Sequence, residues 1–329
     1  MEVLFDNQKI FVAEGQTLLS ALIAGGHHIP HNCCAGACQS CLMQAVEGVP
    51  PAASQEGLKD SLKAQNYFLA CICKPDAPLT VALAPQQNLL RATLVDRLDL
   101  SPSVLRLRLQ SAESFNYRAG QYITLFNSDE IGRSYSLASV SGLDDFLELH
   151  VHLIPNGAVS AWLHDKVLVG DPISLQGPLG DCFYIPGEPE QNLLLVGTGT
   201  GLAPLVGVAR DALHQGHRGE IHLIHGALQT TGLYLHQTLL ELAVQFDNFH
   251  YHASVLHPSA EDVGLQGWSA STVEALSQQV APKPQGWKIY LAGNPDMVNN
   301  LRKQLFLAGA SSRNIYADPF TIPLSDSAL

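Results

Sequence analysis

The spacing of four cysteines is the strongest constraint on how this chain folds. Cys33, Cys38 and Cys41 form a CxxxxCxxC pattern, and Cys71 follows thirty residues after Cys41. Small residues separate the first three cysteines, namely Ala35, Gly36, Ala37 and Ser40. Small side chains let backbone N–H groups come close to a bound centre and hydrogen-bond its sulfur atoms. We therefore expect this part of the chain to wrap around a metal centre.

The identity of that centre follows from the same spacing. CxxxxCxxC with a distant fourth cysteine is the plant-type ferredoxin pattern, so Cys33, Cys38, Cys41 and Cys71 are predicted to bind a [2Fe-2S] cluster. Zinc is the alternative, but zinc sites usually combine two CxxC pairs and this chain has one. A Rieske centre is excluded because the sequence has no CxH and CxxH pair.

Cys73 is the one rival to Cys71 as the fourth ligand. We expect both cysteines on the same face of one strand. The context Leu69-Ala70-Cys71 resembles the ligand position of ferredoxins and favours Cys71. Cys34 and Cys182 are interpreted as small packing residues.

Length and composition indicate a folded, multidomain chain. Its 329 residues exceed the usual size of a single core, and 46% are hydrophobic against 15% charged. The net charge is -12 and no segment carries a run of basic residues, which argues against a nucleic-acid partner. The first residues, MEVLFD, do not resemble a secretory signal, and the cysteine usage favours metal or redox chemistry in the cytoplasm.

The chain is predicted to contain three domains, at residues 1–89, 90–187 and 188–329. The first combines a hairpin at 2–13, a helix at 17–24 and strands at 42–46 and 79–83. The second is a series of short strands that predicts an antiparallel β-barrel, at 105–109, 122–126, 134–138, 146–153 and 172–175. The third alternates strands with helices, which predicts a parallel sheet covered on both faces. Its strands are expected at 193–196, 221–225, 250–255 and 288–291, and its helices at 203–215, 233–246, 270–280 and 296–308. The weakly charged stretch 192–209 is better explained as a strand, turn and helix than as a membrane span, because glycines and Pro204 interrupt it.

Two motifs of the second segment suit a flavin dinucleotide. Arg133 to Ser136 spell RSYS, and a glycine-containing turn, Gly157-Ala158-Val159-Ser160, follows further on. Arg133 would neutralise the pyrophosphate, Tyr135 would stack on the flavin ring and Ser136 would reach its N5 atom. The turn would donate backbone hydrogen bonds to phosphate. RxYS alone is a short pattern that also fits a strand with one ion-paired arginine.

Motifs of the third segment suit a second nucleotide. The loop Gly197-Thr198-Gly199-Thr200-Gly201 follows a buried strand and opens a helix, as a pyrophosphate-binding loop does. Its GxGxG spacing differs from the GxGxxG fingerprint. Further on stand Gly293-Asn294-Pro295 with Met297, and near the end Asp318 and Phe320.

Taken in order over about residues 1–320, these motifs resemble the ferredoxin–NAD(P) reductase family with a ferredoxin domain fused in front, as in the reductase components of bacterial multicomponent oxygenases. The resemblance implies a β-grasp ferredoxin domain, a six-stranded FAD barrel and an α/β NAD domain. It assigns catalytic roles to Ser136 and Asp318, and cofactor contacts to the motif residues named above, Phe320 included. It implies transfer of a hydride from NADH to FAD, then of single electrons to the cluster and to a partner protein, expected to be an oxygenase component.

The chain departs from the family pattern at two positions. Ala292 stands where the family often has cysteine, and Asp318 where it often has glutamate. The missing cysteine affects the expected positioning of the nicotinamide rather than the reaction. NADH is favoured over NADPH because residues 226–232 hold no lysine or arginine to bind a 2′-phosphate.

Alternative functions remain open on the sequence. The same architecture would serve a reductase of a non-oxygenase iron–sulfur enzyme, such as a deoxysugar dehydrase, or an NADPH-dependent reductase. A binding scaffold without redox activity is the third possibility. The histidine pairs His222/His225 and His250/His252 are interpreted as structural, since no third metal ligand is evident near them.

Overall fold

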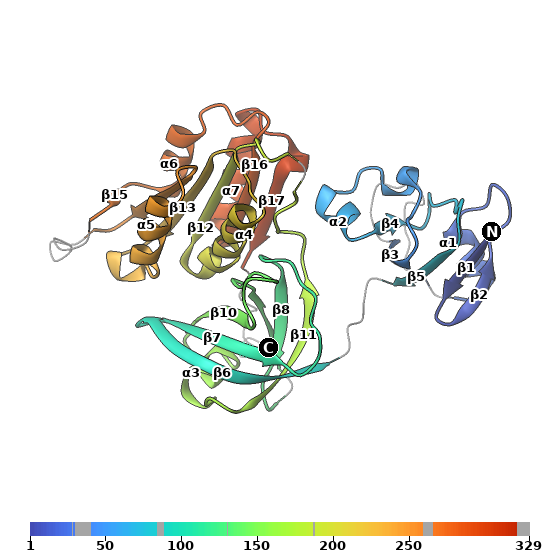
Figure 1. Cartoon of the computed structure of the whole chain (residues 1–329), viewed down its shortest axis with the longest axis horizontal. Helices are drawn as coiled ribbons and strands as arrows, with labels where there is room; N and C mark the ends of the chain where they lie inside the picture. Colours follow the sequence, from blue (N-terminus) through green and yellow to red (C-terminus); the bar gives the residue numbers. More distant parts are fainter. Residues whose placement is uncertain are drawn as a thin grey trace, which may run out of the picture. The chain divides into compact units, whose positions relative to one another are not determined.

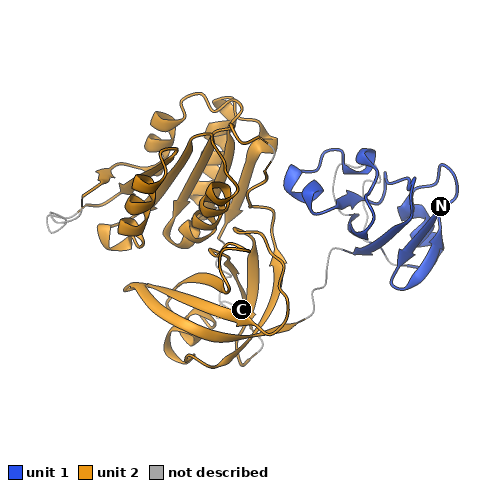
Figure 2. Cartoon of the chain, viewed as in Figure 1, with its two compact units in different colours: residues 1–88 blue, residues 89–329 orange. Residues whose placement is uncertain are grey.

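The computed structural model describes residues 1–27, 29, 41–83, 89–129, 131–186, 188–258 and 266–320. Cys33, Cys34 and Cys38 lie outside these residues. The chain divides into two compact units, residues 1–88 and 89–329, shown in separate colours in Figure 2.

The first unit is a five-stranded mixed sheet with one main helix. The strands lie in the order β2-β1-β5-β3-β4, in which only β1 and β5 are parallel. Its elements are β1 (Glu2–Phe5), β2 (Gln8–Phe11), α1 (Leu18–Ala24), β3 (Leu42–Glu47), α2 (Asp60–Ala64), β4 (Tyr67–Leu69) and β5 (Leu79–Leu83). This arrangement confirms the predicted β-grasp fold.

Helix α1 forms where its end signals predicted. The Thr17 hydroxyl accepts a hydrogen bond from the Ser20 amide at 3.3 Å and so caps the first turn. The helix ends at Gly25 and Gly26, and Gly26 has φ +83°, a conformation that glycine adopts without strain. Leu18 and Leu22 are fully buried and fix the helix to the sheet.

The first half of the second unit is an antiparallel sheet of six strands in the order β10-β7-β6-β11-β8-β9. These are β6 (Leu90–Ser101), β7 (Val104–Ser111), β8 (Tyr122–Phe126), β9 (Gly132–Ser136), β10 (Leu147–His152) and β11 (Pro172–Leu179), with helix α3 (Ser160–Asp165) between the last two. A bridge between Leu137 and Leu149 joins the chain after β9 to β10, so the sheet closes into the predicted barrel.

The second half is a parallel sheet of six strands in the order β15-β14-β13-β12-β16-β17. Its strands are β12 (Leu193–Thr198), β13 (Ile221–Ala227), β14 (Phe249–Val255), β15 (Trp268–Ala270), β16 (Lys288–Gly293) and β17 (Ile315–Pro319). Helices α4 (Leu202–His214) and α5 (His236–Gln245) cover one face, and α6 (Val273–Val280) and α7 (Pro295–Leu307) cover the other (Figure 1). The strand order reverses between β12 and β16, where ligands of open parallel sheets usually bind.

Four of the described strands were not predicted. One is β4 (Tyr67–Leu69), which ends before the two cysteines that were expected to share a strand. β6 carries charged residues along most of its length and buries only Ala92 and Leu94 fully, so its hydrophobic alternation is weak. β15 has three residues, and β17 contains an aspartate and a proline. The predicted helix at 233–246 begins later, at His236, because Leu235 takes the left-handed conformation with φ +57°.

No helix in the described part of the chain is long and apolar enough to cross a bilayer. The stretch that raised this question instead forms β12, a short turn and most of α4. The predicted strand, turn and helix are therefore confirmed for this stretch.

Candidate functional site

The described half of the cluster site lies where β3 begins and β4 ends. Cys41 and Cys71 are buried and neither is in a disulfide, and the Cys41 carbonyl accepts a hydrogen bond from the Ala70 amide at 3.1 Å. The start of α1 fixes the Cys71 turn, since the Leu19 amide donates to Ala70 O at 3.0 Å and the Leu18 amide to Cys73 O at 2.8 Å. Two buried thiols on hydrogen-bonded backbone fit a thiolate-ligated centre.

The placement of Cys71 and Cys73 on one strand was wrong. β4 ends at Leu69, and a turn follows it. Cys73 is fully buried in the core and its thiol hydrogen-bonds the Ser54 side chain. Because Cys33 and Cys38 lie outside the described residues, the set of four ligands stays a prediction.

The RSYS residues occupy β9 at the edge of the barrel. Ser136 is buried, Tyr135 is half-buried and the Arg133 side chain donates to the carbonyl of Gly132 at 2.7 Å. Burial raises the pKa of Tyr135, so its ring stays an uncharged phenol. An aromatic surface and a cation on alternate residues of one strand fit a flavin dinucleotide.

The turn Gly157 to Ser160 leads directly into α3. The Ser160 hydroxyl accepts a hydrogen bond from the Ile154 amide at 3.2 Å. A Cβ on Gly157 would lie 2.4 Å from that hydroxyl, so the turn requires glycine. Ala158 is exposed and Val159 is buried. The Ser160 hydroxyl is thus engaged in holding the turn, and the backbone of the turn remains the candidate phosphate contact.

The loop Gly197 to Gly201 joins β12 to α4 at the reversal of strand order. A Cβ on Gly201 would lie 2.2 Å from the carbonyl oxygen of Ala292, at the neighbouring end of β16. Gly199 has φ +55° and open space where its Cβ would stand. The loop therefore packs tightly against the sheet on one side and leaves room on the other, as the backbone of a nucleotide-binding loop must.

The second loop starts at Gly293 and begins α7. The Asn294 amide donates to the Thr198 hydroxyl at 3.1 Å, which ties the two loops together. The Asn294 side chain caps α7 by accepting from the amides of Asp296 and Met297, and Pro295 occupies the first helical position. The Met297 side chain packs in the core beneath α7. Asn294 and Met297 thus both have structural contacts at this loop.

Ser136 and Asp318 meet where the barrel faces the parallel sheet. The Ser136 hydroxyl donates to Asp318 Oδ2 at 3.5 Å, across 182 positions of sequence. Asp318 is paired with Ala292 across β16 and β17, and Phe320 follows with its amide bonded to Gly293 O at 2.8 Å. The end of the RSYS strand and the carboxyl ends of β16 and β17 thus form one site.

The Asp318 carboxyl is electrostatically perturbed. Burial, together with the charge of Asp181, raises its pKa from 3.8 to about 6, although the Ser136 hydrogen bond works in the opposite direction. Burial followed by the charges of Asp318 and Asp181 also raises the pKa of Tyr122. Neither Asp181 nor Tyr122 was among the predicted site residues, although Tyr122 belongs to the segment Gly120-Gln121-Tyr122 that precedes the RSYS motif. The signals available were the Gly180-Asp181 pair after β11 and the Gly-Gln-Tyr that opens β8.

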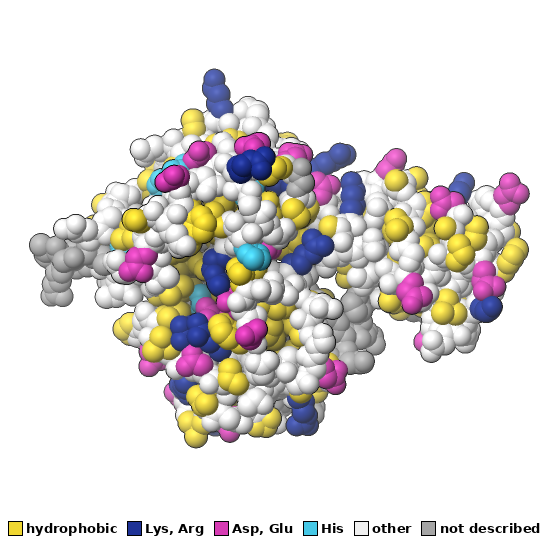
Figure 3. Space-filling view, in the orientation of Figure 1, with side chains coloured by type: hydrophobic (Ala, Val, Ile, Leu, Met, Phe, Trp, Pro, Cys, Tyr) yellow, Lys and Arg dark blue, Asp and Glu magenta, His cyan; other side chains and the backbone are white. Residues whose placement is uncertain are grey.

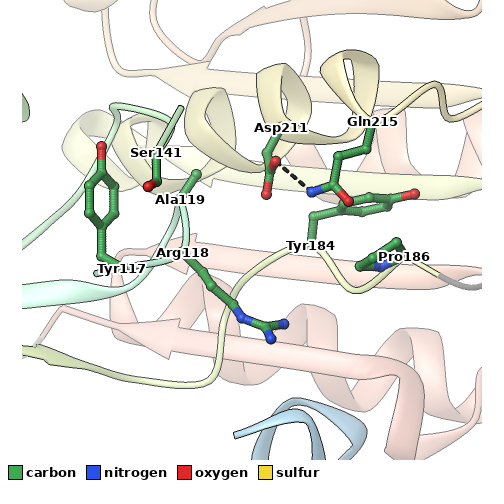
Figure 4. A pocket seen from close by; sticks show the side chains of 8 residues that line it. All are labelled: Tyr117, Arg118, Ala119, Ser141, Tyr184, Pro186, Asp211 and Gln215. Carbon is green, nitrogen blue, oxygen red and sulfur yellow. Dashed lines mark hydrogen bonds between the residues drawn. The ribbon is translucent and has the colours of Figure 1, made fainter. Parts of the chain in front are cut away.

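Side-chain contacts also hold the barrel to the parallel-sheet half. Arg210 on α4 forms two hydrogen bonds of 2.9 Å with Asp144, in the turn before β10. The His150 ring on β10 lies 3.2 Å from the Tyr234 hydroxyl. A separate pocket of about 250 Å³ lies between the segment before β8 and the end of α4, where Asp211 accepts a hydrogen bond from Gln215 (Figure 4). None of the predicted site residues lines this pocket.

Three successive segments of the chain match known domain families. Residues 4–76 match the 2Fe-2S iron-sulfur cluster binding domain, 91–184 the oxidoreductase FAD-binding domain and 195–303 the oxidoreductase NAD-binding domain. The protein therefore has domains for a [2Fe-2S] cluster, FAD and NAD. The predicted boundaries at 89/90 and 187/188 fall between the matched segments and stay predictions.

Comparison with individual proteins gives similarity over nearly the whole chain. An aromatic O-demethylase reductase subunit of Amycolatopsis sp. is 33% identical, with 95% of this chain and 96% of the relative covered. A ferredoxin–NAD(P)(+) reductase component of the naphthalene 1,2-dioxygenase system of Pseudomonas putida is 30% identical, with 97% and 98% covered. The crystal structure of Amycolatopsis cytochrome P450 reductase GcoB has a TM-score of 0.68 at 30% identity and covers 98% of this chain and 99% of that one. The chain therefore belongs to the ferredoxin–NAD(P) reductase family, among the members that carry an N-terminal [2Fe-2S] domain.

Proposed function

We propose that this protein oxidises NADH and passes the electrons through FAD and its [2Fe-2S] cluster to an oxygenase component. The observation that carries the proposal is the contact of Ser136 with Asp318, which joins the RSYS strand to the two nucleotide loops at the reversal of strand order. Similar proteins include reductases of aromatic oxygenase and demethylase systems, which supports an oxygenase as the acceptor.

The chain's own residues would position the reactants. Bound FAD accepts the two electrons of a hydride and releases them singly, which suits a cluster that takes one at a time. Ser136 ends β9 with a buried hydroxyl whose hydrogen bond to Asp318 positions its oxygen before any ligand binds. The loop Gly197 to Gly201 and the end of β16 would hold the nicotinamide nucleotide beside that hydroxyl. Such preorganisation lowers the cost of reaching a reactive geometry.

The proposal is tested by anaerobic titration of the reconstituted protein with NADH. We expect bleaching of flavin and cluster absorbance and the electron paramagnetic resonance signal of a reduced [2Fe-2S] cluster. A protein with full iron and flavin content that shows neither change would refute it, and would favour a scaffold without redox activity.

The role of Ser136 is tested by stopped-flow flavin reduction in Ser136→Ala. We expect the rate of reduction by NADH to fall about a hundredfold, because the hydroxyl positioned at the site is lost. Ser134→Ala is the matched control, since Ser134 lies two residues earlier on β9, is exposed and shares a hydrogen bond with the Thr124 hydroxyl. Equal rates of flavin reduction in both variants would contradict a role for Ser136 in hydride transfer.

NADH is proposed as the electron donor in preference to NADPH. Residues 226–232 span the end of β13 and the turn after it, where a nucleotide 2′-phosphate would require a cation, and they hold no lysine or arginine. We expect kcat/KM for NADH to exceed that for NADPH at least tenfold. Gln229 is exposed in this segment, so Gln229→Arg should narrow the ratio by improving NADPH use. An unmodified protein that prefers NADPH would contradict the assignment.

A non-oxygenase iron–sulfur enzyme, such as a deoxysugar dehydrase, is the alternative acceptor. Reduction of a purified oxygenase component by the protein and NADH separates the two. The charge distribution does not favour a nucleic acid, because acidic and basic side chains are interspersed on the face shown in Figure 3. We propose the cytoplasm as the compartment, since none of the described cysteines, Cys41, Cys71, Cys73 and Cys182, is in a disulfide.

A further inference from the structure

A group of histidines and one glutamate lies at the amino end of the parallel sheet. Glu220 immediately precedes β13, His222 is the second residue of β13 and His250 is the second residue of β14. The register pairs His222 with His250, so their side chains leave the sheet on the same face. One ligand atom from each of Glu220, His222 and His250 lies within 4.8 Å of the others.

The three side chains have the mobility and the donors that a metal ion needs. The His222 ring is half-buried and stacks with the rings of Trp287 and His250, with centroid distances of 5.7 and 4.6 Å. His250 and Glu220 are exposed to 38% and 51% and already contact each other. Tetrahedral zinc with bonds near 2.1 Å holds its ligand atoms about 3.4 Å apart. The two exposed side chains can therefore rotate to close around an ion, while His222 provides a fixed ligand.

His252 orients the fixed ligand. Its Nε2 lies 3.1 Å from Nδ1 of His222, so one ring nitrogen of His222 is engaged and the other is available. Histidine ligands of metals usually hold their second nitrogen in this way. The sequence interpretation missed the site because it paired histidines within each strand, whereas the ligands come from neighbouring strands and from Glu220.

We propose that Glu220, His222 and His250 bind a divalent transition-metal ion of the zinc class, at a site separate from the cofactors. Two imidazoles and a carboxylate form a donor set that zinc accepts, with a fourth position for water. His222 is level with Leu194, and Gly226 with Thr198, so four residues of strand, or about 13 Å, separate this site from the nucleotide loops. The ion would cross-link β13 and β14 and would not compete with NADH.

The test is equilibrium dialysis of the oxidised holoprotein against Zn²⁺, with zinc and iron measured by elemental analysis. We expect one zinc per chain in the wild type and at least tenfold weaker binding in both His250→Gln and Glu220→Gln. His214→Gln, an exposed histidine at the end of α4, is the matched control and should bind as the wild type does. Unchanged iron content in all four proteins shows that zinc has not replaced the cluster.

Thermal unfolding supplies a second readout that is independent of NADH oxidation. Zn²⁺ should raise the Tm of the wild type and of His214→Gln, but not of His250→Gln, because only an ion bound to the folded state stabilises it. Flavin content and Tm without zinc establish that the variants fold. The proposal is overturned if the wild type binds no zinc at micromolar concentrations, or if His250→Gln and Glu220→Gln bind it as tightly as the wild type.

Discussion

The buried position of Asp318 disfavours the charged form of its carboxyl group. Because its pKa is raised from 3.8 to about 6, the folded state binds a proton more tightly than the unfolded chain does. The stability that this provides is fully present below pH 3.8 and is lost as the pH rises through about 6. A shift of this size corresponds to about 3 kcal/mol.

We therefore expect Asp318→Asn to become progressively more stable than the wild type as the pH rises from 4.5 to 6, and the difference to level off above that range. Tm values measured through the pH series, by the release of flavin fluorescence, test this. Asp247→Asn removes an exposed carboxyl and should show no such trend. A difference that does not vary with pH would mean that Asp318 is not the titrating group.

Cys71 and Cys73 differ in what their side chains contact. Cys73 is fully buried and bonded to Ser54, whereas Cys71 stands in the turn beside the Cys41 backbone. Cys71→Ser should lose the cluster's iron and its visible absorbance, and Cys73→Ser should retain both. Iron analysis of the two purified variants tests this. Loss of the cluster only in Cys73→Ser would identify Cys73, and not Cys71, as the fourth ligand.

Functional residues could be predicted from the sequence where they belong to a recognisable motif. They could not be predicted where only the folded structure brings them together. Arg133, Tyr135 and the glycines of the nucleotide loop could be proposed from spacing alone. Asp181 could not, because its effect on Asp318 depends on β11 and β17 coming from different sheets. The same limit applied to Glu220 and the histidines of β13 and β14.

At the scale of elements, the loop between β12 and α4 depends on two glycines for different reasons. Gly201→Ala would place a Cβ 2.2 Å from a backbone oxygen of β16, so strand or helix must move. We expect a loss of about 1–3 kcal/mol in stability and weaker NADH binding. Gly199→Ala meets no atom, and its cost should be the 1–2 kcal/mol of a left-handed residue at most.

Thermal unfolding and the KM for NADH distinguish the two loop variants. Gly201→Ala should lower the Tm more than Gly199→Ala, while both raise KM because the loop faces the nucleotide. If Gly201→Ala proves as stable as the wild type, the contact with β16 is not as tight as described here.

Strands were easier to predict from the sequence when their residues form a clear apolar run. β12 and β16 are nearly continuous apolar runs, β13 and β14 are apolar runs interrupted by histidines, and all four were predicted from the sequence. β6 is long but buries little, and β15 and β17 are edge strands of a few residues. Their pairing is stabilised by neighbours in the sheet, which a local pattern does not record.

At the scale of the whole molecule, the ion pair of Arg210 and Asp144 fixes α4 to the barrel. Asp144 is exposed to only 11% and Arg210 to 32%, so water screens their attraction weakly. We expect a coupling free energy of about 1–3 kcal/mol between Asp144→Asn and Arg210→Gln. A double-mutant cycle on the free energy of unfolding measures it.

The same cycle should be run on the rate of flavin reduction. Each single variant should slow hydride transfer, because loosening α4 shifts the nucleotide loop relative to Ser136. Strictly additive effects on both quantities would show that the pair does not couple barrel and helix. The mutual position of these two halves was not predictable, since it depends on contacts such as this one between residues 66 positions apart.

The hydrophobic core below α4 contains Val104, Cys182 and Tyr184 from the barrel together with Leu205 and Tyr290 from the parallel-sheet half. The core of residues 1–88, in contrast, is built from that unit alone. For an engineer who recombines genes of this family, the two junctions are therefore not equivalent. A chimera joined near residue 88 exchanges a unit that has its own hydrophobic core. A chimera joined near residue 187 must also keep the barrel and the parallel-sheet half complementary where they share a core.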